Sequence, residues 1–425
     1  MRHKGAVADN SSLISMSFHN TVLFKRNLYQ IHFCCQNVLV ANAVPQLVIL
    51  VAGFWNNAHE FLIIIPIFKP HKAFTMTQTM KKLQYLPTFL EAEHTHQRIY
   101  LLAGDLGGTK TNLALFSAMD GELDVVREQT YVSRDYTNIT DMFTDFLEHS
   151  SDTPVQRICI GVAGPVFNGR VELTNLSREL TTEEIRQATG VTHAALINDL
   201  EATAYGLATL SPQQLTTLHR GAATHAGNMA IVAPGTGLGM AGLFWDGQLH
   251  HPFASEGGHS DFAARNDADI RLLKYLQEKY EIVSWERVVS GPGIRDIYSF
   301  LRDVEGYEES STLRMALQQG DESAVISKSA LAGEMGITKK TMELFVRYLG
   351  RVSADLAMKY KSTGGLFLGG GIPPKIAPLL ETGDFYNHYL QGDRMAELLS
   401  SVPLHIVDND KTALWGAAYY AQLLK

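Results

Sequence analysis

Two glycine-rich segments of the sequence contain the residue types that bind phosphate groups. The first reads Asp105-Leu106-Gly107-Gly108-Thr109, the second reads Ala233-Pro234-Gly235-Thr236-Gly237-Leu238-Gly239, and each follows an apolar run. Glycines permit a tight turn and leave no Cβ between the backbone N–H groups and an anion, while Thr109 adds a hydroxyl donor. Asp105 would lie near the metal ion that accompanies nucleotide phosphates and would hold Mg²⁺ through water. Taken alone, each segment is also compatible with an ordinary hairpin turn.

A third glycine cluster, Gly369-Gly370-Gly371, ends another apolar run and would let a flat adenine ring approach the backbone. Its alternative explanation is a strand-to-helix turn that ends at the following prolines. The second cluster can be confused with a dinucleotide fingerprint, but that fingerprint opens a helix, whereas residues 240–245 continue as a strand-like run. The pattern therefore favours phosphate-binding turns at strand ends over a Rossmann domain.

Asn198 and Asp199 lie between a predicted strand and a helix-like segment, at 193–197 and 200–207. Open α/β sheets bind their ligands at this end of a strand. Phosphoryl transfer needs an acceptor hydroxyl aimed in line with the phosphorus and relieved of its proton, and a positioned aspartate performs both tasks. Without the glycine clusters, an Asn-Asp helix cap is the simpler interpretation.

The elements that must position these groups alternate between strands and helices from residue 99 onward. The predicted strands cover 99–104, 112–116, 157–162, 193–197, 229–232 and 365–368, and the predicted helices cover 141–149, 182–189, 338–360 and 411–424. Such alternation indicates an α/β fold. The last helix has its small and apolar residues at packing intervals, so we expect it to pack rather than to catalyse.

Length and composition limit the class of protein. A chain of 425 residues exceeds one hydrophobic core, so two domains and an additional segment are expected. The formal net charge of -8 argues against a nucleic-acid partner. Three cysteines are too few for a disulfide framework, which favours a cytoplasmic location. The apolar run at 38–55 is interrupted by polar residues and is too short for a membrane helix, so no membrane partner is expected.

Residues 1–97 show no sustained hydrophobic period, and Met76 and Met80 lie just upstream of the first predicted strand. We expect an N-terminal extension there, poorly ordered or arising from an upstream start site. The expected domains are a small one at 98–209, completed by 411–425, and a large one at 210–410.

The three glycine clusters, in this order after strands, are similar to the phosphate-1, phosphate-2 and adenosine motifs of the actin, Hsp70 and hexokinase superfamily. Within it, the chain from residue 99 onward resembles the bacterial glucokinases. The resemblance rests on the first two clusters, on Ile197-Asn198-Asp199, and on Glu256-Gly257-Gly258-His259 and Glu286-Arg287-Val288-Val289-Ser290-Gly291-Pro292-Gly293. It implies a two-domain actin-like ATPase fold (ribonuclease H-like) with an interdomain active-site cleft.

The resemblance also implies a reaction and the residues that perform it. The reaction is ATP-dependent, Mg²⁺-assisted phosphorylation of glucose to glucose 6-phosphate at the entry to glycolysis, in a homodimer. Asp199 would be the general base and a glucose ligand, and the other glucose ligands would be Asn198, Glu256, His259 and Glu286. ATP would bind at Asp105, Gly107, Gly108, Thr109, Gly235, Thr236, Gly237, Gly369 and Gly370. By the residues alone, Glu256 and His259 are too few ligands for zinc.

Lys110 occupies a position where that glucokinase group more often has Asn. The resulting Gly-Gly-Thr-Lys sequence is more similar to the related repressor, open-reading-frame and kinase (ROK) family. No cysteine follows His259, however, so the cysteine-rich zinc motif of that family is absent and we place the chain outside it. Three alternatives stay open. One is a kinase for fructose, mannose or an N-acetylated sugar, and another is polyphosphate as the phosphoryl donor. The third is a non-catalytic sugar-sensing regulator, although residues 1–97 lack a basic helix pair for DNA.

Overall fold

The computed structural model describes residues 38–44, 47–56, 59–68, 86–90, 96–150, 154–173, 178–222 and 226–425. The chain divides into two compact units, Met1–Thr79 and Met80–Lys425. The described residues of the first unit form an antiparallel sheet in the order β1-β2-β3, with bounds β1 (Val38–Val44), β2 (Leu47–Asn56) and β3 (His59–Phe68). Most other residues of the predicted extension, including Met76 and Met80, lie outside the described residues. Among the described residues, none of the helices combines the length and apolarity that crossing a bilayer requires.

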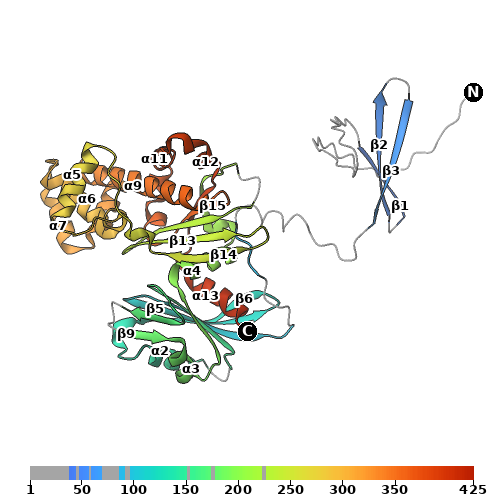
Figure 1. The fold of residues 1–425 in the computed structure, drawn as a ribbon, viewed down its shortest axis with the longest axis horizontal. Coiled ribbons are helices and arrows are strands. Elements are labelled where there is room, and N and C mark those ends of the chain that lie inside the picture. The colour runs from blue at the N-terminus through green and yellow to red at the C-terminus, as the bar shows by residue number, and fades with distance from the viewer. Residues whose placement is uncertain are drawn as a thin grey trace, which may run out of the picture. The chain divides into compact units, whose positions relative to one another are not determined.

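The second unit contains two large sheets, each with its own helices (Figure 1). The first sheet has the order β10-β7-β4-β5-β6, in which β4, β7 and β10 run parallel and β5 and β6 antiparallel. Its strands are β4 (Ile99–Leu106), β5 (Lys110–Met119), β6 (Glu122–Val132), β7 (Arg157–Val162) and β10 (His193–Asn198), with a small β8 (Arg170–Leu173) and β9 (Arg178–Thr181) pair beside them. Its helices are α2 (Ile139–Glu148), α3 (Thr182–Thr189), α4 (Asp199–Gly206) and α13 (Thr412–Leu423).

Alternating residues of this sheet build two separate cores, because successive side chains of a strand point to opposite faces. Leu102 of β4 packs with Phe143 of α2 and Ile185 of α3. Its neighbour Leu101 packs on the other face with Leu414 of α13. The last helix therefore packs against the first sheet, as predicted, although a long stretch of chain separates them.

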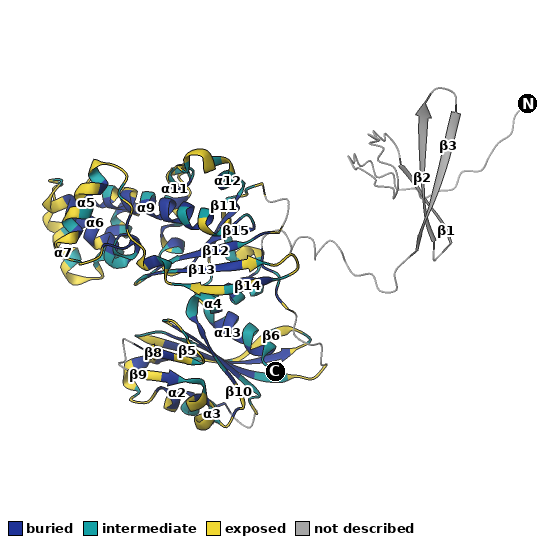
Figure 2. Cartoon of the chain, in the orientation of Figure 1, coloured by how far each residue is buried: buried dark blue, intermediate teal, exposed yellow. Residues whose placement is uncertain are grey.

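The second sheet has the order β11-β16-β15-β12-β13-β14. Its strands are β11 (Leu215–His219), β12 (Met229–Pro234), β13 (Leu238–Trp245), β14 (His250–Ser255), β15 (Gly365–Leu368) and β16 (Leu404–Val407). The helices that follow its strands are α5 (Asp267–Gln277), α6 (Gly291–Asp303), α7 (Ser311–Gln319), α8 (Glu322–Leu331), α9 (Ile337–Tyr360), α10 (Ala377–Leu380), α11 (Asp384–Tyr389) and α12 (Ala396–Ser401). Figure 2 shows that β15 and much of α9 are buried, while α7 is largely exposed.

Helices α4 and α13 lie between the two sheets and cross each other closely (Figure 1). A Cβ on Gly416 would lie 1.7 Å from the carbonyl oxygen of Ala202, and one on Gly206 would lie 2.0 Å from the carbonyl oxygen of Thr412. Glycine is therefore required at both positions. Leu200 of α4 also fills the space where a Cβ on Gly239 of β13 would stand, 2.6 Å away, so α4 contacts the second sheet as well.

Residues 86–90 pack against this helix pair although they precede β4, the first strand of the second unit. Phe89 is 4% exposed, and its ring centroid lies 4.9 Å from that of Tyr205 and 5.7 Å from that of Tyr419. Thr88 N–H donates to Nδ1 of His250 over 3.0 Å. The packed unit thus includes residues upstream of Ile99.

Most predicted elements are confirmed. The strands at 157–162 and 365–368 and the helix at 182–189 have the predicted bounds, and the other predicted elements differ from the observed ones only at their ends. The helix at 182–189 begins with a capping box between Thr181 and Glu184 and ends at Gly190, whose φ is +71°.

Candidate functional site

Asp105 and Asp199 lie at the same edge of the first sheet. Strands β4, β7 and β10 are parallel neighbours, and the register places Asp105 opposite Gly161 and Gly161 opposite Ile197. Asp199 follows two residues after Ile197, as the first residue of α4. A parallel sheet therefore collects the carboxylates at the carboxyl ends of its strands, as predicted.

The surroundings of Asp199 raise the pKa of its carboxyl group above the ordinary value for an aspartate. Burial, the charge of Asp105 and, less strongly, the charge of Glu256 raise the pKa of Asp199 to about 6, against the hydrogen bond that Leu200 N–H donates to it. Burial also raises the pKa of Asp105, although the Asn112 side chain donates a hydrogen bond to that carboxylate. Two half-buried acids whose charges act on each other favour either a shared proton or a cation near them.

Asn198 is the N-cap of α4. Its Oδ1 accepts from the N–H groups of Leu200 and Glu201 at 2.9 and 3.3 Å, and its Nδ2 donates to the Gly164 carbonyl at 3.0 Å. The cap that the sequence left as an alternative is therefore present. One amide hydrogen of Nδ2 still has no protein acceptor among the described contacts, and it is the group with which Asn198 can reach a ligand.

The first glycine turn joins β4 to β5. Gly107 N–H donates to the Lys110 carbonyl at 3.0 Å, and a Cβ on Gly107 would lie 2.9 Å from that oxygen. The fully buried Ser133 supports the turn from the end of β6, because its hydroxyl donates to the Gly107 carbonyl at 2.7 Å and its N–H to the Thr109 carbonyl at 3.0 Å. Thr109 itself is exposed, so its hydroxyl is accessible to a phosphate.

Replacing Ser133 with Ala is expected to loosen this turn. The resemblance implies that this turn binds the phosphates of ATP, so loss of the hydrogen bond to Gly107 should raise the KM for ATP roughly three- to tenfold, because one net hydrogen bond contributes about 1 kcal/mol. Steady-state kinetics with varied ATP measures the change. Ser117→Ala removes another buried hydroxyl from β5 away from the turn and should leave the ATP KM unchanged. Equal ATP KM values for the Ser133 variant and the wild type would contradict the role of Ser133.

The second glycine turn joins β12 to β13. Gly235 N–H donates to the Gly237 carbonyl at 2.8 Å, and Gly291 N–H, at the start of α6, donates to the Gly235 carbonyl at 2.8 Å. A Cβ on Gly237 would lie 2.5 Å from Oε2 of Glu286, which accepts from Leu238 N–H at 3.0 Å. This turn therefore contacts both the beginning of α6 and one of the predicted sugar ligands.

The third glycine cluster lies beside the second turn. Gly369 N–H donates to the Val232 carbonyl at 2.9 Å. Gly370 has a φ of +77°, and a Cβ there would lie 2.6 Å from the Pro234 carbonyl oxygen, so this position requires glycine. The neighbouring Gly371 is exposed, and a Cβ on it would meet no atom within 4 Å. The cluster thus forms an open backbone surface next to Gly235.

The three remaining predicted sugar ligands form one group. His259 lies between two carboxylates: its Nδ1 is 3.7 Å from Oε2 of Glu256, and its Nε2 is 3.9 Å from Oε1 of Glu286. The side chains of Glu256 and His259 are 60% and 65% exposed, and that of Glu286 is 23% exposed, so all three are accessible to a ligand. The influence of Glu256 on the pKa of Asp199 connects this group to the proposed base. The predicted sugar ligands therefore form one group whose Glu256 charge acts on the predicted base.

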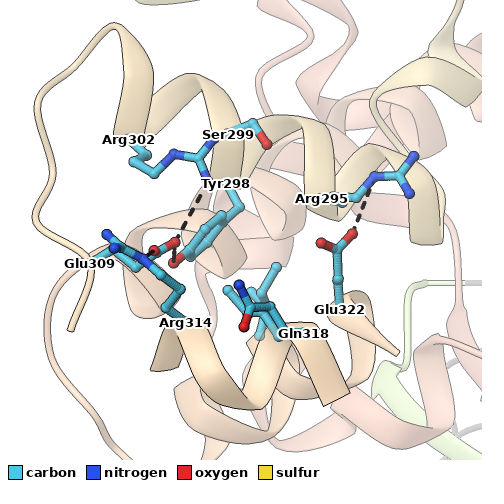
Figure 3. Close-up of a pocket in the computed structure, with 10 residues that line it drawn as sticks. Arg295, Tyr298, Ser299, Arg302, Glu309, Arg314, Gln318 and Glu322 are labelled. Atoms are coloured by element: carbon cyan, nitrogen blue, oxygen red, sulfur yellow. Dashed lines mark hydrogen bonds and ion pairs between the residues drawn. The ribbon is translucent and has the colours of Figure 1, made fainter. Parts of the chain in front are cut away.

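A pocket of about 280 Å³ lies between α6, α7 and α8, apart from all the predicted site residues (Figure 3). Its charged groups pair with one another: Arg314 Nε is 2.5 Å from Oε2 of Glu309, which is 5% exposed, and Arg295 Nε is 3.6 Å from Oε2 of Glu322. Tyr298 also donates to Glu309 at 2.9 Å. These contacts join the three helices, so the charged groups of the pocket are used in holding the helices together.

Sequence reasoning missed Ser133 and the contact between Glu286 and the second turn. Ser133 is 26 residues from Gly107, and Glu286 is 48 residues from Leu238. Both contacts arise from strands and loops that meet only in the fold. Neither contact has a local signal in the sequence, because the strand that ends before Ser133 was not predicted and Glu286 lies far from the second turn along the chain.

Comparison with known proteins matches nearly the whole second unit. A family model described as Glucokinase matches residues 102–424. A glucokinase of Trichormus variabilis is 40% identical over 339 residues, covering 76% of this chain and 99% of the relative. A glucokinase of Synechocystis is 37% identical over 347 residues, covering 76% of this chain and 98% of the relative.

Among solved structures, a glucokinase from an Antarctic psychrotroph superposes with a TM-score of 0.66 at 33% identity. The superposition covers 76% of this chain and 99% of that one. This likeness confirms the two-domain actin-like α/β fold that the glycine clusters predicted. Residues 86–90, which pack against α4 and α13, precede the segment that the family model matches.

Proposed function

Because the chain belongs to the glucokinase family, a family of ATP-dependent sugar kinases, we propose that it transfers the γ-phosphoryl group of ATP to glucose. The product is glucose 6-phosphate, which enters glycolysis. The observation that carries the proposal is the grouping of Asp199, with its raised pKa, beside Asp105 and near Glu256. A sugar-sensing regulator that does not catalyse would not need a carboxylate with a raised pKa.

Asp199 acts as the general base. A pKa of about 6 leaves the carboxylate ionised at neutral pH while making it a better proton acceptor than an ordinary aspartate. It accepts the proton of the sugar hydroxyl as the oxygen attacks the γ-phosphorus. Its position at the start of α4, fixed by the Asn198 cap, holds it in place for that transfer.

Glu256, His259 and Glu286 bind the other sugar hydroxyls, and Asn198 contributes its remaining amide hydrogen. Carboxylates and an imidazole offer directional acceptors, and a site that pairs each hydroxyl discriminates against sugars that leave a group unpaired. Glu286 is fixed by Leu238 N–H through Oε2, so its Oε1 can face the sugar.

ATP binds along the three glycine clusters, with its phosphates at Gly107, Gly108, Thr109, Gly235, Thr236 and Gly237 and its adenosine at Gly369 and Gly370. Mg²⁺ fits this site, because Asp105 offers carboxylate oxygens near the end of β4, beside the first glycine turn, and a hard divalent cation prefers oxygen donors. Asp105 would hold the ion through water. When bound, the ion neutralises charge on the phosphates.

The two lobes, residues 98–209 with 411–425 and residues 210–410, would close on both substrates and exclude water from the transfer. Helices α4 and α13 lie between the sheets and are the natural hinge. We also propose a homodimer in the cytoplasm, outside the ROK family and without nucleic-acid or membrane partners; light scattering of the purified protein tests the dimer. The free, buried Cys159 fits a reducing compartment.

A coupled assay with a panel of hexoses tests the function. Glucose is expected to give the highest kcat/KM, and fructose, mannose and N-acetylglucosamine lower values. A higher kcat/KM for one of the other sugars would replace glucose as the substrate. Turnover with polyphosphate in place of ATP would identify polyphosphate as the phosphoryl donor. Sugar binding without turnover would favour a sugar-sensing regulator.

The rate should depend on pH through Asp199. The base must be ionised, so kcat/KM for glucose is expected to be constant above pH 6 and to fall about tenfold per pH unit below it. Asp105→Asn removes a charge that raises this pKa, so the midpoint of its residual activity should move to lower pH. Initial rates between pH 5 and 8 measure both midpoints. An unchanged midpoint in the Asp105 variant would contradict this electrostatic origin.

A further inference from the structure

The two segments that carry the proposed sugar ligands are joined by a backbone hydrogen bond. Trp285 N–H donates to the Ser260 carbonyl at 2.9 Å. His259 directly precedes Ser260, and Glu286 directly follows Trp285. The joint between Ser260 and Trp285 therefore sets the separation of the imidazole and the Glu286 carboxylate.

A buried ion pair anchors the chain just beyond this joint. Arg351 of α9 donates from Nη1 to Oδ2 of Asp269, in the first turn of α5, over 2.7 Å, and the two side chains are 2% and 0% exposed. Arg351 also donates from Nη2 to the Ala263 carbonyl. Asp269 accepts from Arg265 N–H at 3.0 Å. One ion pair thus holds the backbone at two points, Ala263 and Arg265, shortly after His259.

Three aromatic rings surround the guanidinium group of Arg351. Its Cζ lies 5.9 Å from the ring centroid of Phe262, 5.7 Å from that of Trp285 and 5.6 Å from that of Tyr348. Phe262 and Trp285 contact each other edge to face with centroids 5.2 Å apart. The guanidinium therefore packs against Phe262, which lies two residues after Ser260, and against Trp285, which is one of the two residues of the joint.

We propose that Arg351 is a positioning residue for sugar binding. Through Ala263, Phe262 and Trp285, it fixes the distance between His259 and Glu286 without touching the sugar. A buried ion pair is commonly no more stable than an apolar replacement, so retaining one here is better explained by geometry than by stability. The inference rests on the proposed function, since it assigns sugar binding to that pair.

The test is Arg351→Met, with Arg351→Lys as a milder variant. A lysine keeps the charge but lacks the planar guanidinium group, so it cannot donate to the Asp269 carboxylate and to the Ala263 carbonyl in the same geometry. We expect the Met variant to raise the KM for glucose roughly ten- to hundredfold, with a smaller rise for Lys, because small misplacements of binding groups are costly. The KM for ATP should rise less than the KM for glucose, since Arg351 reaches the second glycine turn only indirectly, through Glu286 and its hydrogen bond from Leu238 N–H. Steady-state kinetics with each substrate varied measures the split.

Arg127→Met is the matched control. Arg127 of β6 donates to the Phe146 carbonyl at 2.7 Å and to the Ser150 hydroxyl at 2.9 Å, so its loss destabilises the first lobe without reaching the sugar residues. It should lower the melting temperature and leave the glucose KM unchanged. A glucose KM equal to that of the wild type in both Arg351 variants would overturn the proposal, as would an equal rise in the Arg127 variant.

Amide hydrogen exchange of the sugar-free protein gives a second readout that does not depend on activity. Exchange at Arg265 and Trp285 should be faster in the Arg351 variants than in the wild type, and unchanged in Arg127→Met. If the wild type phosphorylates none of the hexoses, the proposed function fails, while exchange still decides whether Arg351 fixes the joint. Unchanged exchange at both amides would overturn the positioning role.

Discussion

Replacing Asp199 with Asn is expected to lower kcat by about 10² to 10⁴, because the amide keeps the shape of the side chain but cannot accept the sugar proton. The KM for ATP should change little, since the nucleotide contacts the glycine turns. Coupled turnover of ATP and glucose measures the loss. Glu201→Gln is the matched control: Glu201 is the next acid along α4, and its pKa is also raised by burial, but it is two residues farther from the strand end. Retention of more than a tenth of kcat in the Asp199 variant would exclude it as the base.

The same Asp199 variant should be more stable than the wild type in metal-free buffer. A folded-state pKa of about 6, above the ordinary value of 3.8, means that ionised Asp199 opposes folding, fully above pH 6 and not at all below about pH 4. Asparagine removes this cost, so the free energy of unfolding at pH 8 should rise on the order of 3 kcal/mol, and the gain should vanish as the pH falls toward 4. Denaturant titrations at both pH values separate lost chemistry from lost folding.

Replacing Gly370 with Ala is expected to raise the KM for ATP roughly ten- to hundredfold. A Cβ at this position would approach the Pro234 carbonyl oxygen to 2.6 Å, and the φ of +77° is one that L side chains rarely adopt. The loop must therefore shift away from β12, which displaces the proposed adenosine surface. Kinetics with varied ATP, and the thermal shift that glucose alone produces, measure the two affinities.

Gly383→Ala provides the control for this prediction, because Gly383 also has a positive φ, +91°, but nothing lies within 4 Å of a Cβ there and it precedes α11, outside the glycine clusters. We expect its ATP KM to stay within about twofold of the wild type. Glucose should stabilise both variants as it stabilises the wild type. Equal kinetics in the two variants would show that Gly370 has no special role, and loss of the glucose effect would indicate general damage to the lobe.

The sequence predicted those elements whose residues follow a clear local pattern. Residues 157–162 form a nearly unbroken apolar run because β7 is buried in the middle of its sheet. Strand β6 was missed because it is an edge strand that exposes charged residues along most of its length. Helix α7 was missed as well, and none of its residues is fully buried.

In the candidate site, too, local features could be predicted and contacts between distant residues could not. Glycine turns and the Asn198 cap are local features, so their positions could be read from consecutive residues. The contacts that hold the site are not local: 82 residues separate Arg351 from Asp269, and 26 separate Ser133 from Gly107. The sequence motifs identify the residues that are expected to act. The contacts that hold those residues in place come from packing between elements that are distant in the sequence.

The segment at 86–90 shows that similarity boundaries and folding boundaries differ in this chain. Leu86 and Phe89 are 9% and 4% exposed, yet both precede the family match at 102–424. Burying a leucine and a phenylalanine contributes on the order of 3–6 kcal/mol, an upper estimate that is nonetheless a large share of the net stability of a typical domain. A protein shortened to residues 102–424 would lack the side chains of Leu86 and Phe89, so Tyr205 and Tyr419 would be more exposed to water. The proposed hinge, α4 and α13, would then have less apolar surface packed against it.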